Sequence, residues 1–447
     1  MSVRPTVLVG GRVIDPDSSF DGIADVLIGS DGTISEVGVN LAAQTDAKWR
    51  RIDLSGKWVL PGLVDIHTHL REPGFEYKET VDTGSRSAVA GGFTTIACMA
   101  NTKPVNDTGA VTRFIVERAK ACGLARVLPI GALSRGLQGQ ELAEISDMLD
   151  EGAVAISDDG HPVMDAHLMR RGLEYSRIFG VPVSVHEEDS CLSHGGSMNE
   201  GPVSTRLGLT GIPNAAEDVL VARDIVLAEL TGGHLHIAHI STAGAVRMVR
   251  QAQERGVHVT TEVTPHHFSL TDEACVEYDT STKMAPPLRR GPDVAACIEG
   301  LKDGTICCIA TDHAPHPAQD KDVEFELAAY GIVGLETAWG LTMRLVEAGH
   351  FDLMTAVRLF TTGPSECWKL QTGTLRPGRP GDVCVIDPQE RQTVVPADLW
   401  SRSHNTPFAG WTLPTRVDRT IFGGRTVFVQ DGVRGLIGDE AARYRVR

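Results

Sequence analysis

The sequence has few of the features that are typical of nucleic-acid-binding and membrane proteins. Its 447 residues carry 42 Lys and Arg against 58 Asp and Glu, a net charge of −16, and only 5% are aromatic. The chain has no run of basic residues with which to bind a phosphate backbone. This argues against nucleic acid as a partner. It also has no apolar segment long enough to span a bilayer and no signal-peptide pattern at Met1. We therefore expect a cytoplasmic protein with no membrane partner.

Cysteine is scattered through the chain without a pairing motif. The nine cysteines include no Cys-x-x-Cys spacing, and Cys98, Cys307 and Cys308 lie inside apolar segments. Buried free thiols behave as small hydrophobic side chains, and an odd number of them does not suit a disulfide scaffold. The pattern predicts a reducing compartment and a core that needs no cross-links.

The middle of the chain alternates strand-like and helix-like segments. A first strand leads into His67, seven further apolar segments follow, and several helices are expected to end at glycines such as Gly123 and Gly180. Eight parallel βα units over about 300 residues indicate an α/β fold of the (β/α)8 barrel type. The seven further strands are expected at 93–99, 126–131, 153–157, 181–185, 234–239, 257–263 and 305–311.

The two ends of the chain have a different pattern. Short strands separated by turn dipeptides such as Asp31-Gly32 are typical of antiparallel hairpins. Two strand-rich ends around an alternating middle predict one small β-sandwich module assembled from both termini. We place this module at residues 1–55 plus 372–447 and the barrel at residues 56–371.

The stretch PGLVDIHTHLR predicts the core of a functional site. The apolar run from Val59 to Ile66 indicates one buried strand that ends in His67-Thr68-His69. Residues two apart in a strand point to the same side, so His67 and His69 can present both imidazoles to one metal ion. An isolated His-x-His pair is more often metal-free, so the interpretation depends on the rest of the chain.

Potential metal ligands recur at the carboxyl ends of the predicted strands. In a (β/α)8 barrel these ends meet at one mouth, where catalytic residues lie. The candidates are His67, His69, Asp158 or Asp159, His186, His239 and Asp312. Nitrogen and oxygen ligands without a thiolate favour Zn²⁺, with Mn²⁺, Co²⁺ or iron as alternatives. Two ions roughly 3.5–4 Å apart, bridged by one carboxylate, can share a hydroxide and polarise the bond that it attacks.

Eight motifs, in this order, resemble the dihydroorotases of the amidohydrolase superfamily. They are PGLVDIHTHLREPG, GGFTTIACMANTKP, AISDDGHPV, HEEDSCLSHGGSMNEG, LGLTGIP, KMAPPLR, TDHAPH and YGIVGLET, and they span the predicted barrel. The similar hydantoinases and allantoinases carry a lysine on the fourth strand, whose carbamate bridges the metals. This chain has no lysine between Lys120 and Lys283, so it resembles the type that uses an aspartate there.

The resemblance implies a role for each candidate ligand. The two histidines of the first strand would hold one ion and two histidines of later strands the other, with Asp159 as the bridge and Asp158 as a neighbouring cap. Asp312 would complete the first site and act in turn as general base and general acid. The implied metal ligands are His67, His69, Asp159, His186, His239 and Asp312.

The same resemblance implies the reversible hydrolysis of L-dihydroorotate to N-carbamoyl-L-aspartate, a step of pyrimidine biosynthesis. This substrate carries a free carboxylate, which a guanidinium can grip through two parallel hydrogen bonds. Arg71, two residues after His69, is the candidate, and a surface ion pair of Arg71 with a neighbouring glutamate is the alternative. The further substrate-binding residues implied by the resemblance are Asn101, His316, Tyr330 and Gly331.

One departure from the family pattern leaves alternatives open. Ala285 in KMAPPLR stands where the family has an asparagine that contacts substrate, and the lost hydrogen bond is worth roughly 0.5–1.5 kcal/mol. Another cyclic amidohydrolase, acting on hydantoin or allantoin, is therefore an alternative. A non-catalytic subunit that scaffolds aspartate transcarbamoylase, a partner of this family, is a second one, although all six ligand positions are filled. The resemblance also implies a homo-oligomer, namely a dimer.

Overall fold

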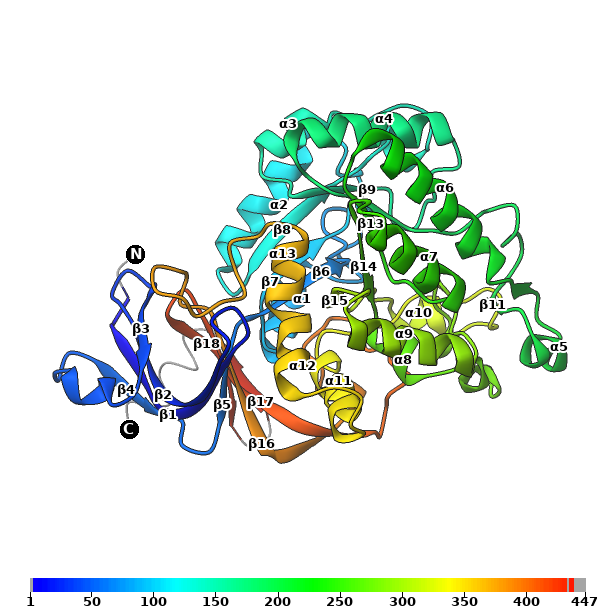
Figure 1. Cartoon of the computed structure of the whole chain (residues 1–447). Coiled ribbons are helices and arrows are strands. Elements are labelled where there is room, and N and C mark those ends of the chain that lie inside the picture. The colour runs from blue at the N-terminus through cyan, green and yellow to red at the C-terminus, as the bar shows by residue number, and fades with distance from the viewer. Residues whose placement is uncertain (1–2, 432–433, 438–447) are drawn as a thin grey trace.

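The computed structural model describes residues 3–431 and 434–437, so positions 1–2, 432–433 and 438–447 of the predicted terminal module lie outside the described residues. Figure 1 shows a barrel surrounded by helices, with a curved sheet beside it. The sheet joins strands from the beginning of the chain with strands from near its end. The predicted fold class, a (β/α)8 barrel with a small β module built from both ends, is confirmed.

The barrel strands follow one another in chain order. They are β6 (Leu63–Thr68), β7 (Phe93–Cys98), β8 (Arg126–Gly131), β9 (Ala155–Ser157), β10 (Val183–Val185), β13 (Leu235–Ile237), β14 (Val259–Val263) and β15 (Cys308–Ile309). Over the described residues these eight strands form one parallel sheet, and a parallel bridge between Thr68 and His313 links its two edges. Side chains that follow the strands therefore face a common mouth.

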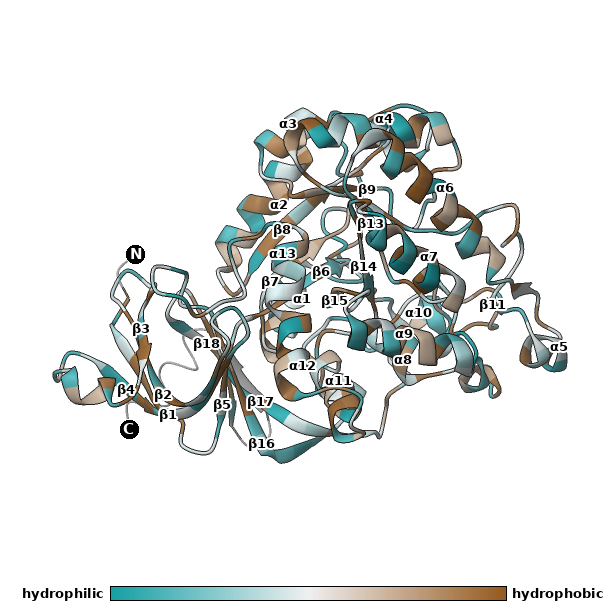
Figure 2. Ribbon diagram, viewed as in Figure 1, coloured by the Kyte–Doolittle hydropathy of each residue, from teal (hydrophilic) through white to brown (hydrophobic). Residues whose placement is uncertain are grey.

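Helices cover the outside of the barrel. The longer ones are α1 (Val81–Ala90), α2 (Gly109–Cys122), α4 (Ala166–Phe179), α6 (Ala215–Thr231), α7 (Ala243–Glu254), α9 (Gly291–Asp303), α11 (Ala338–Glu347) and α12 (Leu353–Phe360). Brown and teal alternate around them in Figure 2, as expected for helices with one apolar face. As predicted, α2 and α4 end at Gly123 and Gly180, whose φ angles of 62° and 68° are left-handed. Among the described helices, none combines the length and apolar character that a membrane crossing requires.

Shorter elements lie between these strands and helices. They are α3 (Ile145–Asp150), β11 (Met198–Asn199), α5 (Pro202–Leu207), β12 (Gly211–Ile212), α8 (Pro265–Ser269), α10 (Ala318–Lys321) and α13 (Thr362–Cys367). β11 and β12 pair with each other in a small sheet of their own. The core between barrel and helices includes Phe93 of β7 and Phe360 of α12, whose rings meet edge to face with centroids 5.8 Å apart. This packing fixes the strands whose ends form the mouth.

The terminal module is one continuous, mostly antiparallel sheet. Its strands are β1 (Thr6–Asp15), β2 (Phe20–Ile28), β3 (Ile34–Gly38), β4 (Arg50–Asp53), β5 (Trp58–Pro61), β16 (Val383–Thr393), β17 (Thr412–Phe422), β18 (Arg425–Asp431) and β19 (Arg434–Ile437). Their order is β19-β18-β17-β16-β5-β1-β2-β3, with β4 paired to β1. Buried side chains such as Leu8, Val26 and Val383 form a cluster on this sheet, which thereby has a core of its own.

The apolar run from Val59 to Ile66 forms two strands, so the prediction of a single strand is wrong. β5 pairs with β16 and β1 in the terminal sheet, whereas β6 begins the barrel at Leu63. Between them Gly62 packs so tightly on Thr94 that a Cβ atom at Gly62 would lie 2.1 Å from Thr94 Oγ1. The chain passes there from sheet to barrel. An apolar pattern shows that a strand is buried but does not show which sheet it joins.

Candidate metal centre

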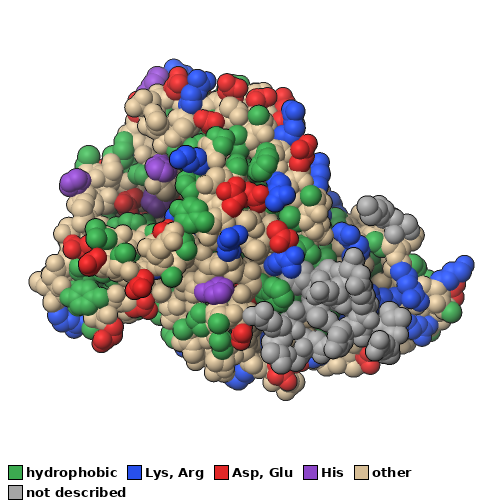
Figure 3. Space-filling view, turned by 180° about the vertical axis from the view of Figure 1, so that it is seen from behind, with side chains coloured by type: hydrophobic (Ala, Val, Ile, Leu, Met, Phe, Trp, Pro, Cys, Tyr) green, Lys and Arg blue, Asp and Glu red, His purple; other side chains and the backbone are tan. Residues whose placement is uncertain are grey.

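The predicted metal ligands converge at the carboxyl ends of the barrel strands. They border a cavity of about 630 Å³. Figure 3 shows, on the face behind the view of Figure 1, a hollow in which histidine and acidic side chains gather. His67 lies fully buried beneath the mouth. The predicted site residues that line the cavity are His69, Arg71, Asn101, Asp159, His186, His239, Asp312, His316, Tyr330 and Gly331.

The carboxylate of Asp159, which follows β9, lies between four imidazoles. Its Oδ1 atom is 3.3 Å from His239 Nε2 and 3.5 Å from His67 Nε2. The same oxygen is 3.7 Å from His186 Nδ1, while Oδ2 is 3.5 Å from His69 Nε2. Asp159 thus contacts the histidines of both predicted ion sites, as a bridging ligand must.

Asp158 and Asp159, the two neighbouring aspartates that follow β9, point in different directions. Asp158 accepts hydrogen bonds from the backbone N–H groups of Leu133 (2.8 Å) and Ser134 (2.9 Å), so it caps the loop after β8. Asp312, which follows β15, has its Oδ1 atom 2.9 Å from the Nε2 atom of His69. Of these three aspartates, Asp159 and Asp312 face the predicted histidine ligands, and the assignment of these two as ligands stays a prediction.

The ligand atoms of the centre fit a divalent cation. His67 Nε2 and Asp159 Oδ1 are buried, and the described residues give neither atom a hydrogen-bond partner. An unpaired buried polar atom costs roughly 1–3 kcal/mol, which coordination of a cation would offset. Imidazole nitrogens and carboxylate oxygens are donors that zinc and related ions accept. Two sets, each with its ligand atoms within 4.8 Å of one another, are His67, Asp159 and His239, and His67, His69 and Asp312.

A buried glutamate on β14 orients His67 and was missed in the sequence. Glu262 Oε1 lies 2.5 Å from His67 Nδ1, and Glu262 Oε2 lies 3.3 Å from His236 Nε2. When His67 donates its Nδ1–H to this carboxylate, its Nε2 lone pair faces the cavity side. Asn101 Oδ1 is similarly placed, 3.0 Å from His69 Nδ1. A glutamate inside the predicted strand 257–263 was the available signal.

Three carboxylates of the centre have lowered pKa values. Burial would raise the pKa of Asp159, but the charge of His67 and the close contacts with the imidazoles of His186 and His239 hold this pKa well below its ordinary value. Burial also opposes ionisation of Asp312, yet His69 and His67 keep its pKa lowered. For Glu262, burial is again outweighed by His67, and the pKa falls to about 2. The three carboxylates are ionised at neutral pH and together attract a cation.

Three residues at the same mouth have a strained backbone conformation. Arg71, His239 and Asp312 have φ angles of 63°, 34° and 46°, a region that residues other than glycine seldom adopt. Each such residue costs on the order of 1–3 kcal/mol and persists only where the surrounding structure enforces it. Six other described residues share this conformation, so the strain supports a functional role here only together with the side chains that these three positions place at the mouth.

Arg71 faces the cavity and does not pair with its neighbouring glutamates. Glu72 instead accepts from Arg118 at 2.8 Å, and Glu76 accepts from the backbone N–H of Gly74 at 2.8 Å. Burial lowers the pKa of Arg71 to about 10, so the side chain stays charged at neutral pH. Its Nε is buried and has no hydrogen-bond partner among the described residues. The surface ion pair considered from the sequence is therefore not formed.

The remaining substrate-binding candidates are also at the mouth, with contacts of their own. His316 Nε2 lies 3.3 Å from Arg71 Nη2. The Tyr330 hydroxyl donates to the Gly196 carbonyl at 2.7 Å. The backbone N–H of Gly331 donates to the Lys283 carbonyl at 3.0 Å, and the Gly331 carbonyl accepts from the Asn405 side chain at 3.0 Å. Ala285 lines the same cavity and supplies no polar side chain.

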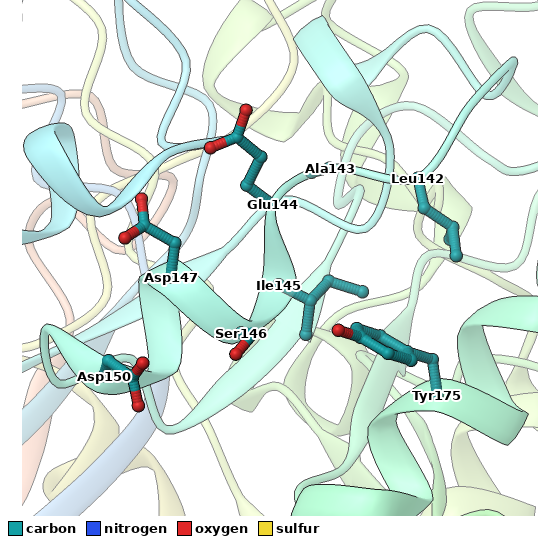
Figure 4. Close-up of a pocket in the computed structure, with 8 residues that line it drawn as sticks. All are labelled: Leu142, Ala143, Glu144, Ile145, Ser146, Asp147, Asp150 and Tyr175. Atoms are coloured by element: carbon teal, nitrogen blue, oxygen red, sulfur yellow. The ribbon is translucent and has the colours of Figure 1, made fainter.

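A second cavity, of about 490 Å³, lies on the outside of the barrel at α3 (Figure 4). It is lined by Leu142, Ala143, Glu144, Ile145, Ser146, Asp147, Asp150 and Tyr175. Asp147 accepts a hydrogen bond from the backbone N–H of Gly109 at 2.8 Å, which ties α3 to the start of α2. Within the described residues no imidazole lines this cavity, so its carboxylates have no metal-ligand partners of the kind found at the mouth.

The barrel and its cluster of histidines and carboxylates define the class of protein, a metal-dependent amidohydrolase. Solved structures of hydantoinases share the fold, and two of them illustrate the likeness. The L-hydantoinase from Arthrobacter aurescens matches with a TM-score of 0.84 and 24% identity, over 96% of each chain. The D-hydantoinase from Thermus sp. matches with a TM-score of 0.83 and 24% identity, over 98% of this chain and 97% of its own. At this identity the likeness concerns the fold alone.

Sequence relatives define the family within this class. A family model described as Dihydro-orotase-like matches residues 56–245. The dihydroorotase of Anaeromyxobacter sp. (strain K) is 56% identical over 420 residues, which are 94% of this chain and 96% of the relative. The dihydroorotase of Pelotomaculum thermopropionicum is 54% identical over 431 residues, 96% of this chain and 99% of the relative. The chain belongs to the dihydroorotase family.

Proposed function

We propose that this chain hydrolyses L-dihydroorotate reversibly to N-carbamoyl-L-aspartate, a step of pyrimidine biosynthesis. The observation that carries the proposal is the pairing of two features in one cavity. The metal-ligand cluster around Asp159 lies at its base, and the guanidinium of Arg71 faces the same space with a buried, unpartnered Nε. A substrate with a hydrolysable amide and a separate carboxylate matches both features.

The proposed cofactor is a pair of Zn²⁺ ions, with Mn²⁺ or Co²⁺ as substitutes. His67 and His69 would hold one ion with Asp312, His186 and His239 would hold the other, and Asp159 would bridge them. When bound, such ions activate water at neutral pH and polarise the carbonyl under attack. The chain's own contribution is to fix the ligands, in part through the carboxylate of Glu262 behind His67.

Asp312 is the proposed proton carrier. Because its pKa is lowered, the carboxylate is ionised at neutral pH and can accept the proton of the attacking water. It then delivers that proton to the ring nitrogen as the amide bond breaks. In the synthetic direction the same carboxylate takes a proton from the ureido nitrogen. One residue can serve both steps because it lies beside His69 and also lines the substrate cavity.

Arg71 is the proposed anchor for the substrate carboxylate, with Asn101 and His316 beside it. Burial and the charges of Arg71 and Lys78 lower the pKa of His316 to about 2, so its imidazole is neutral. A neutral His316 accepts a hydrogen bond from Arg71 and leaves the charge of the guanidinium for the substrate. Tyr330 and Gly331 are proposed to border the ring of the substrate.

The alternatives have less support. A hydantoinase of the carbamylated-lysine type would need a lysine where this chain has Asp159. A non-catalytic scaffold would not need six ligands, all of which gather at one mouth. We also propose that the protein is a cytoplasmic homodimer that can associate with aspartate transcarbamoylase. Light scattering of the purified protein, alone and mixed with the transcarbamoylase, tests both assemblies.

The activity test is ring opening by the zinc-loaded protein. L-dihydroorotate, hydantoin and allantoin are offered in parallel, and metal content is counted on the same sample. We expect turnover of dihydroorotate alone. Turnover of hydantoin or allantoin in its place, with two metals bound per chain, would contradict the proposed substrate.

A further inference from the structure

Three cysteines meet near the strand that leads to Asp312. Cys308 begins β15 and Cys307 directly precedes it, whereas Cys367 ends α13, sixty positions after Cys307. Cys307 Sγ lies 2.9 Å from Cys367 Sγ and 3.8 Å from Cys308 Sγ. Cys308 and Cys367 are buried among apolar side chains such as Val64, whereas Cys307 keeps part of its surface exposed. The sequence predicts inert thiols here, but it does not show that a third cysteine joins the pair.

A glycine holds α13 against β15. A Cβ atom at Gly363 would lie only 2.3 Å from the backbone oxygen of Cys307, so no larger residue fits at this contact. Gly363 and Cys367 are four residues apart and lie on the same face of the helix. The close approach at Gly363 therefore brings the Cys367 thiol to the Cys307 thiol. The juxtaposition is built into the packing of two elements and is not a chance meeting of surface side chains.

We propose that Cys307 and Cys367 form a peroxide-sensitive thiol pair that oxidises to a disulfide linking β15 to α13. This is a modification site distinct from the metal centre. A disulfide needs the two sulfurs to approach to about 2 Å with their Cβ atoms roughly 3.5–4.5 Å apart, which adjacent side chains on packed elements can reach. Cys308 is the less suitable partner for Cys307, because its sulfur is farther away and the two residues are consecutive.

The chemistry requires only a peroxide as oxidant. The Cys307 thiolate attacks one oxygen of hydrogen peroxide, an S–O bond forms, the O–O bond breaks, and the other oxygen leaves as water after taking up a proton. The Cys367 sulfur then attacks the Cys307 sulfur. The S–S bond forms, the S–O bond breaks, and the hydroxide leaves as water with the proton of the Cys367 thiol. In total two thiols are oxidised, one peroxide is reduced, and two waters are released.

The surroundings of Cys307 favour its role as the attacking thiol. Hydrogen bonds from the thiols of Cys308 and Cys367 lower the pKa of Cys307 well below its ordinary value. Thiolate character together with partial exposure is what makes a cysteine sensitive to oxidation. Cys98 and Cys384 are buried without such neighbours, and burial raises the pKa of each thiol.

The experiment is peptide mapping of the full-length, metal-loaded protein. The reduced protein is treated with hydrogen peroxide, free thiols are blocked in denaturant, and non-reduced tryptic peptides are identified by mass spectrometry. We expect a Cys307–Cys367 cross-link that disappears on treatment with dithiothreitol. The Cys308→Ser variant should keep this cross-link. In Cys367→Ser the cross-link is lost, and Cys307 should instead accumulate as a sulfenic acid that dimedone traps.

The wild-type map decides the proposal even if a variant folds poorly. Recovery of both thiols free, while exposed Cys191 is oxidised in the same sample, would overturn it. A Cys307–Cys308 bond in place of the Cys307–Cys367 bond would overturn it as well. The ring-opening activity of the reduced variants serves as the check that they are folded.

Discussion

Two of the cavities bordered by described residues are similar in size and differ in chemistry. The mouth cavity measures about 630 Å³ and the outer cavity at α3 about 490 Å³, and both are lined by carboxylates. At the mouth, Asp159 and Asp312 face imidazoles from separate strands. At α3, the carboxylate of Asp147 accepts from a backbone N–H and serves the local structure. Volume therefore does not identify the site; the convergence of ligands from distant parts of the chain does.

The largest expected difference between the two cavities concerns proton transfer. Replacing Asp312 by Asn removes the proposed general base, and we expect kcat for dihydroorotate to fall by about 10²–10⁴-fold. The matched variant Asp147→Asn makes the same change in the outer cavity and should leave kcat unchanged. Steady-state kinetics of both zinc-loaded variants make the comparison. A similar loss of kcat in the two variants would contradict a specific catalytic role for the carboxylate at the mouth.

The second largest expected difference between the two cavities concerns metal affinity. Glu262→Gln replaces the charged acceptor behind His67 with a neutral one, and we expect zinc affinity to weaken by about 10–100-fold. Competition with a chromogenic chelator measures this without reference to activity. Glu144→Gln in the outer cavity is the control and should bind zinc as the wild type does. Unchanged affinity in a folded Glu262→Gln protein would count against the positioning role of this carboxylate.

Substrate capture should depend on the shape of the Arg71 side chain as well as on its charge. Arg71→Lys keeps the charge but loses the paired donors, and hydrogen bonds to charged groups are worth about 1.5–3 kcal/mol. We expect kcat/KM for dihydroorotate to fall by about 10- to 150-fold, with most of the change in KM. Arg113→Lys, at an ion pair with Glu151 on the outside, is the matched control. Equal kinetics for the two variants would contradict the proposed role of Arg71 in substrate binding.

The smallest expected effect is a gain in kcat/KM. Ala285→Asn restores a polar side chain to the mouth cavity, and one hydrogen bond of about 0.5–1.5 kcal/mol would raise kcat/KM by about 2- to 12-fold. Ser146→Asn adds the same side chain to the outer cavity and should change nothing in the kinetics. A fall in activity for Ala285→Asn would mean that another group already occupies this place.

The barrel could be predicted from the sequence because the alternation of strands and helices is a local pattern. Alternating strands and helices, and the glycines that end α2 and α4, depend on neighbours a few residues apart. The division of the apolar run at Gly62 was missed because it depends on Thr94, which only the folded chain brings near. Local patterns thus show elements reliably, whereas the boundary between two packed sheets is a tertiary property.

The same distinction holds for the site. The convergence of the candidate ligands could be predicted because they lie at or just after the ends of strands, and strand ends share one edge in this fold. Glu262 was missed because a glutamate within a strand reveals its partner only in three dimensions. The meeting of Cys367 with Cys307 was missed for the same reason, since sixty positions separate the two residues.

The most direct test of the account is a crystal structure of the zinc-loaded protein with anomalous scattering at the zinc edge. We predict two peaks at the mouth, about 3.5–4 Å apart, with the Asp159 carboxylate between them. His67 and His69 should touch one peak, and His186 and His239 the other. Peaks outside the mouth, or an Asp159 carboxylate turned away from them, would contradict the central claim that these ligands converge to form the active site.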